Sequence, residues 1–291
     1  MSSDVMPMTE HRPRRQRSQS SGATDAALLF DEPGPRGRIL IAIGSVVAVI
    51  GIAALAAAVL YRLDLAGQLD YPKWRYFLGQ SVVSQLLEAA GTTLTLGGVA
   101  AVLTFPLGIA LGWLRLLDNR PIKWLVGLWI DAMRAVPMLL LVYFFLLVVP
   151  RFATISDFWK LALPIVMCTS ATTAEVFRSG VRALDRGQTE AAWALGMSPS
   201  LTMRLILAPQ ALRLMLPTLI TQMVTIIKGT TLAYVLAYPE LMYRGSTMIG
   251  QAKIDAHLSV FFQTYVIIAV LYIIVNWSLG ALARYIESRT R

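Results

Sequence analysis

Five side chains stand out because they could bind a polar solute from within otherwise apolar sequence. Arg134, Glu175 and Lys228 are charged, and Thr230 and Thr231 add two hydroxyl groups after Lys228. An ionisable group in an apolar span is costly, so it usually faces a cavity or a partner charge. An ammonium beside two hydroxyls could bind a carboxylate, and a carboxylate could bind an amino group. These five residues form the candidate substrate pathway.

Each charged group also has a structural interpretation. Lys228 could pair with Glu175 or Asp131 and hold two helices together. Arg134 lies three residues after Asp131, on the same face of a predicted helix, which favours a local ion pair. Glu175 could pair with Arg178 in the same way. These pairings are the preferred interpretation, and contact with a substrate is the alternative.

The other chemistry-bearing residues predict no catalytic site. One cysteine, Cys168, and two histidines, His11 and His257, leave no zinc-ligand cluster at a recognisable spacing. Residues 245–250 have the glycine spacing of a phosphate loop, but the Lys and Ser or Thr that must follow are absent. We therefore expect no metal site, no bound cofactor and no enzymatic activity in this chain.

The composition indicates a membrane protein. Of the 291 residues, 56% are hydrophobic and 15% are charged, and the mean hydropathy is +0.60. Soluble domains average roughly 45–50% apolar and about 25% charged residues. The net charge of +9 could indicate nucleic acid, but in so apolar a chain it favours a membrane.

Apolar blocks predict six transmembrane helices and therefore an all-α integral membrane protein. A helix needs ~20 apolar residues to cross the bilayer, and continuous runs of this length do not alternate as barrel strands do. Pro137 is expected to break the third helix. The blocks are residues 39–61, 89–114, 124–150, 158–177, 214–238 and 256–283.

The distribution of Lys and Arg predicts that both termini lie inside the cell. Most basic residues fall in the segments that are inside when the N-terminus is inside. The basic N-terminal tail is expected to be disordered and to contact lipid headgroups rather than nucleic acid. The predicted parts are a cytoplasmic tail (1–37), an anchor helix (38–62), an extracytoplasmic or interfacial segment (63–88), a five-helix core (89–284) and a cytoplasmic tail (285–291).

The loop over residues 181–212 is long, lies inside and is rich in small residues. Thr189 is expected to cap a short helix and Gly196 to end it. Ser198 and Pro199 are expected to begin a second helix. The loop therefore predicts a helix–turn–helix at the membrane surface.

Small residues on this loop leave a low-relief face on which another protein could dock. Ala191, Ala192 and Gly196 form that face, and Glu190 with nearby arginines could add charge complementarity. The alternative is an ordinary amphipathic helix lying in the membrane interface.

The loop resembles the cytoplasmic "EAA" loop of the membrane subunits of bacterial ABC importers. It carries Glu-Ala-Ala, Gly, Ile and Pro at the family's spacing, with Ala208 in place of the usual Leu. In that family the loop is a coupling helix that fits a groove on the ATPase subunit. The residues to which the resemblance assigns this role are Glu190, Ala191, Ala192, Gly196, Ile206 and Pro209.

Three further segments resemble the polar-amino-acid branch of these permeases. They are residues 134–137, 174–180 and 228–232. Ala135 and Val136 replace the usual Gly and Thr, and Gly229 replaces the usual Asp. The extra first helix and its lead-in at 31–36 are similar to those of actinobacterial glutamate-transport permeases.

The resemblance implies an ATP-driven importer subunit for a polar amino acid, glutamate being one candidate, in the bacterial cytoplasmic membrane. Its expected partners are two ATPase subunits that hold ATP and Mg²⁺, a related second permease, an extracytoplasmic amino-acid-binding protein and membrane lipid. The alternatives are an ion-coupled secondary amino-acid carrier and a membrane scaffold or sensor without transport.

Overall fold

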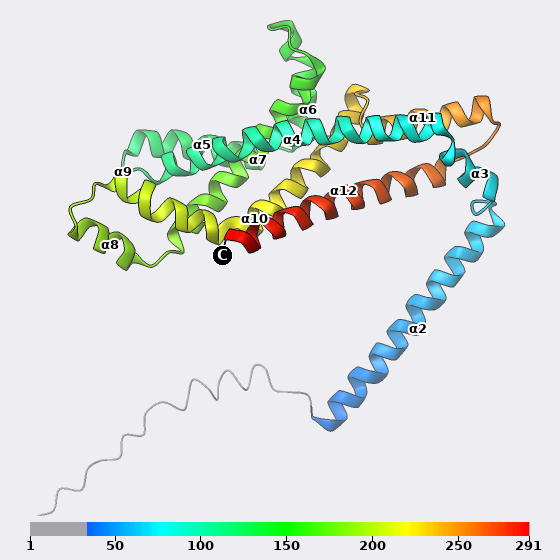
Figure 1. Cartoon of the computed structure of the whole chain (residues 1–291), viewed down its shortest axis with the longest axis horizontal. Coiled ribbons are helices and arrows are strands. Elements are labelled where there is room, and N and C mark those ends of the chain that lie inside the picture. Colours follow the sequence, from blue (N-terminus) through cyan, green and yellow to red (C-terminus); the bar gives the residue numbers. More distant parts are fainter. Residues whose placement is uncertain (1–33, 291) are drawn as a thin grey trace, which may run out of the picture. The chain divides into compact units, whose positions relative to one another are not determined.

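The computed structural model describes residues 34–290 as helices joined by short connections (Figure 1). It divides into two units, Met1–Leu65 and Ala66–Arg291, which are taken separately below. No strand occurs among the described residues, which confirms the all-α class. The predicted basic tail falls largely on residues 1–33, which lie outside the described part of the chain, as does Arg291.

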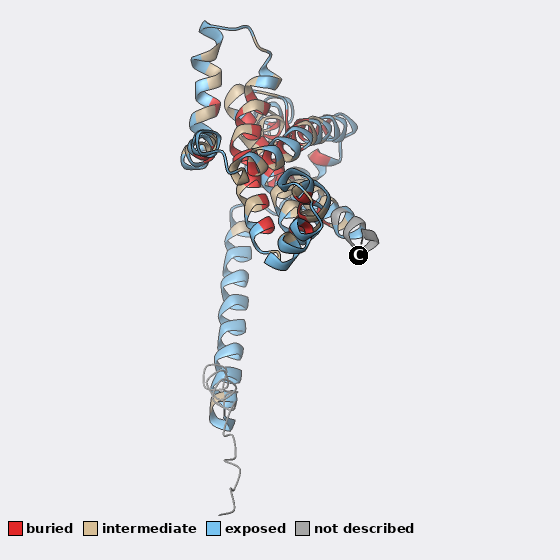
Figure 2. Ribbon diagram, turned by 90° about the vertical axis from the view of Figure 1, so that its left-hand side faces the viewer, coloured by how far each residue is buried: buried red, intermediate tan, exposed pale blue. Residues whose placement is uncertain are grey.

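The described part of the first unit is one long helix. α2 (Pro35–Leu65) has 31 residues, begins slightly earlier than the predicted anchor, and buries none of its residues (Figure 2). At 1.5 Å per residue it is about 46 Å long, which exceeds the ~30 Å hydrocarbon layer. Its apolar surface on all sides suits a helix surrounded by lipid.

The second unit consists of α-helices connected by short helical turns. Its α-helices are α3 (Tyr71–Arg75), α4 (Gln80–Leu116), α5 (Arg120–Ala135), α6 (Met138–Leu147), α7 (Asp157–Arg182), α8 (Arg186–Ala194), α9 (Pro199–Thr202), α10 (Ala208–Gly229), α11 (Leu241–Asp255) and α12 (Phe261–Thr290). The turns are η1 (Tyr76–Leu78), η2 (Val149–Arg151), the π-helical η3 (Met203–Leu207) and η4 (Thr230–Leu236).

Four described helical stretches are long and apolar enough to cross a membrane, and a fifth is added if the bent pair α5 and α6 is one span. The four are α2, α4, the run Pro199–Leu236 and Phe261–Leu282. The chain is thus a multi-pass membrane protein, while the number six and the inside termini stay predictions. α7 is absent from this set, and Thr169, Ser170, Thr173 and Glu175 make it more polar than a lipid-facing helix.

The break at Pro137 is confirmed. α5 ends at Ala135, Val136 is extended, and Pro137 caps α6, so that the two helices are inclined at 96°. Proline lacks an N–H and disfavours the helical conformation of the residue before it, which explains an abrupt bend at this point.

The core is built around the contact between α4 and α7. Fourteen of the 26 residues of α7 are buried. A β-carbon at Gly108 would lie 2.8 Å from the Ser170 carbonyl oxygen, and one at Gly112 would lie 2.6 Å from that of Ala174. The two backbones therefore approach as closely as small-residue contacts allow, which is a common way to pack membrane helices.

One buried hydrogen bond crosses the same contact. The Thr104 and Thr169 hydroxyls lie 2.8 Å apart, and Thr169 Oγ1 lies 2.6 Å from the Ile165 carbonyl oxygen. Since the Thr169 proton is used on its own helix, Thr104 is the donor across the interface. The bond fixes the register of the two helices.

The segment before α4 is partly helical. It contains α3 and η1, and its Gln68 carbonyl accepts from Trp74 Nε1 at 3.2 Å and from Gln263 Nε2 on α12 at 2.5 Å. These bonds attach the start of the second unit to α12. The predicted interfacial segment 63–88 thus has its own tertiary contacts.

The α4–α7 contact leads to a stability prediction. Gly108→Ala is expected to lower the apparent melting temperature of the purified protein, because the added methyl meets backbone and overpacking costs about 1–3 kcal/mol. The assay follows Cys168, the single cysteine, which is buried and reacts with a thiol-specific fluorophore only on unfolding. The matched control is Gly98→Ala on the same helix, where a β-carbon meets nothing within 4 Å. Equal melting temperatures for the two variants would contradict the prediction.

Candidate functional site

The last turn of α4 carries an arginine that joins three helices. Arg115 donates to both carboxylate oxygens of Asp131 on α5, from Nη1 at 3.2 Å and from Nη2 at 3.1 Å. Nη1 also donates to Glu175 Oε2 on α7 at 3.0 Å. The guanidinium presents several N–H donors in a rigid fork, so it can serve two carboxylates at once. Arg115 therefore links α4, α5 and α7.

Glu175 is shared between two arginines. Arg178, one turn later on α7, donates to Oε1 of Glu175, which confirms the predicted pair. The side chains of Glu175, Arg178 and Arg115 are each 20% exposed. Because each of its oxygens accepts from a guanidinium, Glu175 is charge-compensated within the protein.

The predicted pair between Arg134 and Asp131 is wrong. Both oxygens of Asp131 bind Arg115 instead. Within the described residues, no carboxylate oxygen lies within the 4.0 Å ion-pair limit of Arg134. The spacing along the sequence indicates only possible neighbours on the same helix. Arg115, from α4, donates two hydrogen bonds to Asp131 and so makes the stronger contact. Among the described residues Arg134 forms no ion pair, and the nearby carboxylate of Glu175 interacts with it only at longer range.

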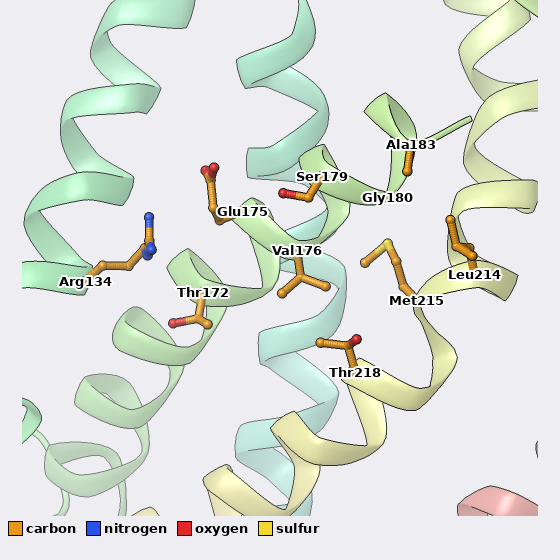
Figure 3. Close-up of a pocket in the computed structure, with 10 residues that line it drawn as sticks. All are labelled: Arg134, Thr172, Glu175, Val176, Ser179, Gly180, Ala183, Leu214, Met215 and Thr218. Atoms are coloured by element: carbon orange, nitrogen blue, oxygen red, sulfur yellow. The ribbon is translucent and has the colours of Figure 1, made fainter. Parts of the chain in front are cut away.

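Arg134 instead lines a cavity of about 410 Å³ between α5, α7 and α10. Figure 3 shows its side chain extending from α5 toward α7, where Glu175 lies. Cavities of this size accommodate small molecules. A guanidinium, a carboxylate and hydroxyls on its wall offer binding groups for a zwitterion. The lining residues are Arg134, Thr172, Glu175, Val176, Ser179, Gly180, Ala183, Leu214, Met215 and Thr218.

Lys228, Thr230 and Thr231 lie away from this cavity, at the end of α10. Lys228 is exposed there, and among the described ion pairs it has neither of the two predicted carboxylate partners. The pairing preferred from the sequence is therefore wrong. The five candidate pathway residues fall in two places, two at the cavity and three at the end of α10.

Thr230 and Thr231 each donate their hydroxyl proton to a backbone carbonyl three residues earlier in the chain. Thr230 is fully buried and donates to the Ile227 carbonyl at 2.7 Å, and Thr231 donates to the Lys228 carbonyl at 2.7 Å. Thr230 is thus part of the packing in this conformation, whereas Thr231 is only partly buried.

The first helix of the 181–212 loop begins earlier than predicted. Asp185 is the N-cap of α8, and its Oδ1 accepts from the Gly187 N–H at 2.7 Å. Thr189 lies inside α8, so its predicted capping role is wrong. Aspartate is the stronger cap because its short carboxylate reaches the free N–H groups of the first turn.

The end of α8 and the start of the next helix follow the prediction. Gly196 has φ +77°, the left-handed conformation that ends helices and favours glycine. Ser198 caps α9 by accepting from the Leu201 N–H at 3.3 Å, with Pro199 in the first turn. The second helix continues through the π-helical η3 into α10.

The surface of α8 mixes small, charged and large apolar residues. Glu190 and Ala191 are exposed, and Ala192 packs inward. Trp193 is 55% and Leu195 82% exposed. This apolar surface is available either to a partner protein or to the membrane interface.

The remaining two residues of the pattern lie where η3 meets α10. Ile206 is half-buried and Pro209 is exposed. Gln210 Nε2 donates to Gln188 Oε1 at 3.3 Å and so connects α10 back to α8. α8 is therefore attached directly to a long membrane helix.

Comparison with known proteins places this architecture in a family. Residues 104–291 match the model of the "binding-protein-dependent transport system inner membrane component" family. The chain belongs to this family. It is a permease subunit, and the predicted resemblance to ABC importer permeases is confirmed.

The curated relatives are permeases of polar-amino-acid transporters. The probable glutamine ABC transporter permease GlnP of Bacillus subtilis is 33% identical over 68% of this permease and 89% of its own length. The glutamate transport system permease GluD of Corynebacterium glutamicum is 34% identical over 77% and 82%, respectively.

Solved structures share the fold. A crystal structure of an amino acid ABC transporter, described as "with histidines", matches with a TM-score of 0.64 at 24% identity, over 72% of this permease and 95% of that chain. An inward-facing MetNI methionine transporter matches with a TM-score of 0.61 at 15% identity, over 73% and 99%.

Sequence reasoning missed two residues of this permease. Arg115 directly follows the apolar block 89–114, and its partners lie 16 and 60 positions away, so the sequence pattern does not connect them. Glu240 falls between two apolar blocks, where no pattern predicts burial, yet it is fully buried. For Arg115, the available signal was an arginine at the very end of a span whose neighbouring spans carry unexplained carboxylates.

Arg115→Lys is expected to lower the melting temperature of the permease in the Cys168 assay. One ammonium keeps the charge but cannot hold Asp131 and Glu175 in the same fork geometry. The matched control is Arg120→Lys, an exposed arginine at the start of α5. If both variants melt like the unsubstituted protein, Arg115 does not hold these helices together.

Proposed function

We propose that this permease is the translocation subunit of an ATP-driven importer for a polar amino acid, with glutamate as the substrate, in the bacterial cytoplasmic membrane. N-in and C-in orientation of its spans is part of the proposal. The observation that carries it is the cavity wall, where Arg134 forms no ion pair and Glu175 is already paired with two arginines. The names of the glutamate and glutamine permeases among its relatives support the substrate class.

The charge balance at this cavity favours an acidic amino acid. The carboxylates of Asp131 and Glu175 are compensated by Arg115 and Arg178, which leaves the guanidinium of Arg134 in excess. Arg134 is exposed on the cavity wall, so its guanidinium is open to an anionic group of a substrate. Glutamate brings one more carboxylate than glutamine, so it gains more from Arg134.

In this proposal the other candidate pathway residues form a second place where the substrate is contacted. Lys228 and Thr231 lie at the end of α10 and are not fully buried. Substrate would meet them at one stage of alternating access and Arg134 with Glu175 at another. Thr230 would act there only after leaving its buried position.

Coupling to ATP is proposed to run through α8. Glu190 and Ala191 are exposed to an ATPase subunit, and Gly196 fixes the turn that follows them. Ala192, Ile206 and Pro209 would attach that contact to the membrane helices. ATP and Mg²⁺ would be held by a pair of ATPase subunits, and this chain would bind no cofactor.

The complete importer would contain further components. A binding protein would deliver the amino acid from outside, and a related second permease would supply the other half of the pathway. Membrane lipid would surround α2. The proposal is tested by reconstituting the permease with these partners in proteoliposomes and measuring uptake of labelled amino acids. Uptake without ATP would favour a secondary carrier, and absence of uptake would favour a scaffold or sensor.

Arg134→Gln is expected to reduce glutamate uptake roughly 10- to 100-fold, because one charge-assisted hydrogen bond is lost. Glutamine uptake should fall less. Arg151→Gln, at an exposed arginine of η2, is the control and should leave both unchanged. Equal loss for glutamate and glutamine would contradict the assignment of Arg134 to the acidic side chain.

Glu190→Lys is expected to reduce ATP-dependent uptake by roughly tenfold or more, because a reversed charge opposes a complementary contact. Folding should be retained, since the side chain is exposed. Glu88→Lys, an exposed glutamate on α4, controls for charge reversal. Unchanged uptake in Glu190→Lys would exclude the proposed coupling contact.

A further inference from the structure

A fully buried carboxylate stands at the start of α11, outside the cavity and outside the 181–212 loop. Glu240 is 0% exposed. No Lys or Arg nitrogen of the described residues forms an ion pair with it. Burying a carboxylate without a counter-ion is costly unless hydrogen bonds compensate it. The burial of Glu240 therefore has to be compensated by hydrogen bonds.

Three donors converge on Glu240. Its Oε1 accepts from the Tyr243 N–H at 2.8 Å, and its Oε2 accepts from the Met242 N–H at 2.9 Å. The Tyr272 hydroxyl on α12 donates to the same Oε2 at 2.8 Å. Burial raises the pKa of Glu240, and the three hydrogen bonds oppose that rise. The carboxyl group thus caps α11 and joins it to α12.

The length of the side chain is the informative feature. Helix N-caps are usually Ser, Thr, Asp or Asn, whose short side chains reach only the first-turn N–H groups. Glu240 satisfies two of those groups and also reaches a neighbouring helix. The next residue adds a second link, because the Leu241 N–H donates to Thr93 Oγ1 on α4 at 3.2 Å. The start of α11 is therefore hydrogen-bonded to two long helices, α4 and α12.

This anchor lies at the end of the segment that joins α10 to α11. η4 runs from Thr230 to Leu236, and Ala237 then adopts φ +53°, a strained value for a residue with a β-carbon. A strained residue persists only where its surroundings hold it, and Glu240 lies three positions later. Lys228 and Thr231 stand at the opposite end of the same segment.

We propose that the hydrogen bond between Glu240 and Tyr272 makes Glu240 a positioning residue, which holds residues 230–243 against α12. Through that segment it sets the position of Lys228 and Thr231, and this second step rests on the proposed function. A shorter Asp would keep the cap and lose the link, whereas Phe at 272 would remove the hydroxyl that makes the link and leave the cap in place.

The first test measures amide hydrogen exchange of the full-length permease in detergent. Glu240→Asp and Tyr272→Phe should each speed exchange of peptides covering 230–243 by about tenfold, since each loses one charge-assisted hydrogen bond. Exchange in α7 should not change. The double variant should be no faster than either single variant, because both remove the same bond. Tyr243→Phe and Glu88→Asp are the matched controls.

The second test measures uptake by the reconstituted complex. The two link variants should raise the KM for the amino acid severalfold while basal ATP hydrolysis per complex stays unchanged. A purely structural role would lower both activities together. Additive exchange effects, or no change in exchange, would overturn the positioning role. Lack of uptake by the unsubstituted complex would overturn the proposed function alone, since the exchange test does not depend on it.

Discussion

The close contact between α4 and α7 is the constraint on which the rest of the second unit depends. Gly108 and Gly112 have no side chains to hold the two backbones apart. The hydrogen bond between Thr104 and Thr169 fixes the position of one helix along the other. Only with the helices at this distance does Arg115 reach a carboxylate on α7. The arrangement of charge at the cavity is thus a consequence of helix packing within about two turns of Arg115.

Charge in the apolar part of this permease is compensated unequally. Arg115 donates to the carboxylates of Asp131 and Glu175, and Arg178 also donates to Glu175. Arg134 is placed nearby without such a partner. Arg115 and Arg134 both lie close to Asp131, but only Arg115 binds it, because Arg115 can donate two hydrogen bonds to the carboxylate at once. The difference between the two arginines therefore comes from their positions in the fold and not from the residue type.

Much of the fold follows from local sequence. Long apolar runs locate α2, α4 and α12, a proline locates the bend before α6, and a glycine with a serine locates the turn after α8. Partner choice does not follow, because Arg115 finds Asp131 and Glu175 across distances that no helical period encodes. Hydropathy also does not place α7 among the candidate spans, because α7 carries polar side chains that bond to other helices of the protein.

The polar links on α4 have a mechanical consequence. Thr93, about a third of the way along the helix, and Arg115, near its end, are about 33 Å apart along the axis at 1.5 Å per residue. Each of them binds other helices. Pro106 lies between them and lacks the N–H that would complete the helix there. α4 is therefore attached to other helices at Thr93 and at Arg115, and one backbone hydrogen bond is missing between these attachments. A bend of α4 between the two attachments would break the fewest hydrogen bonds at Pro106.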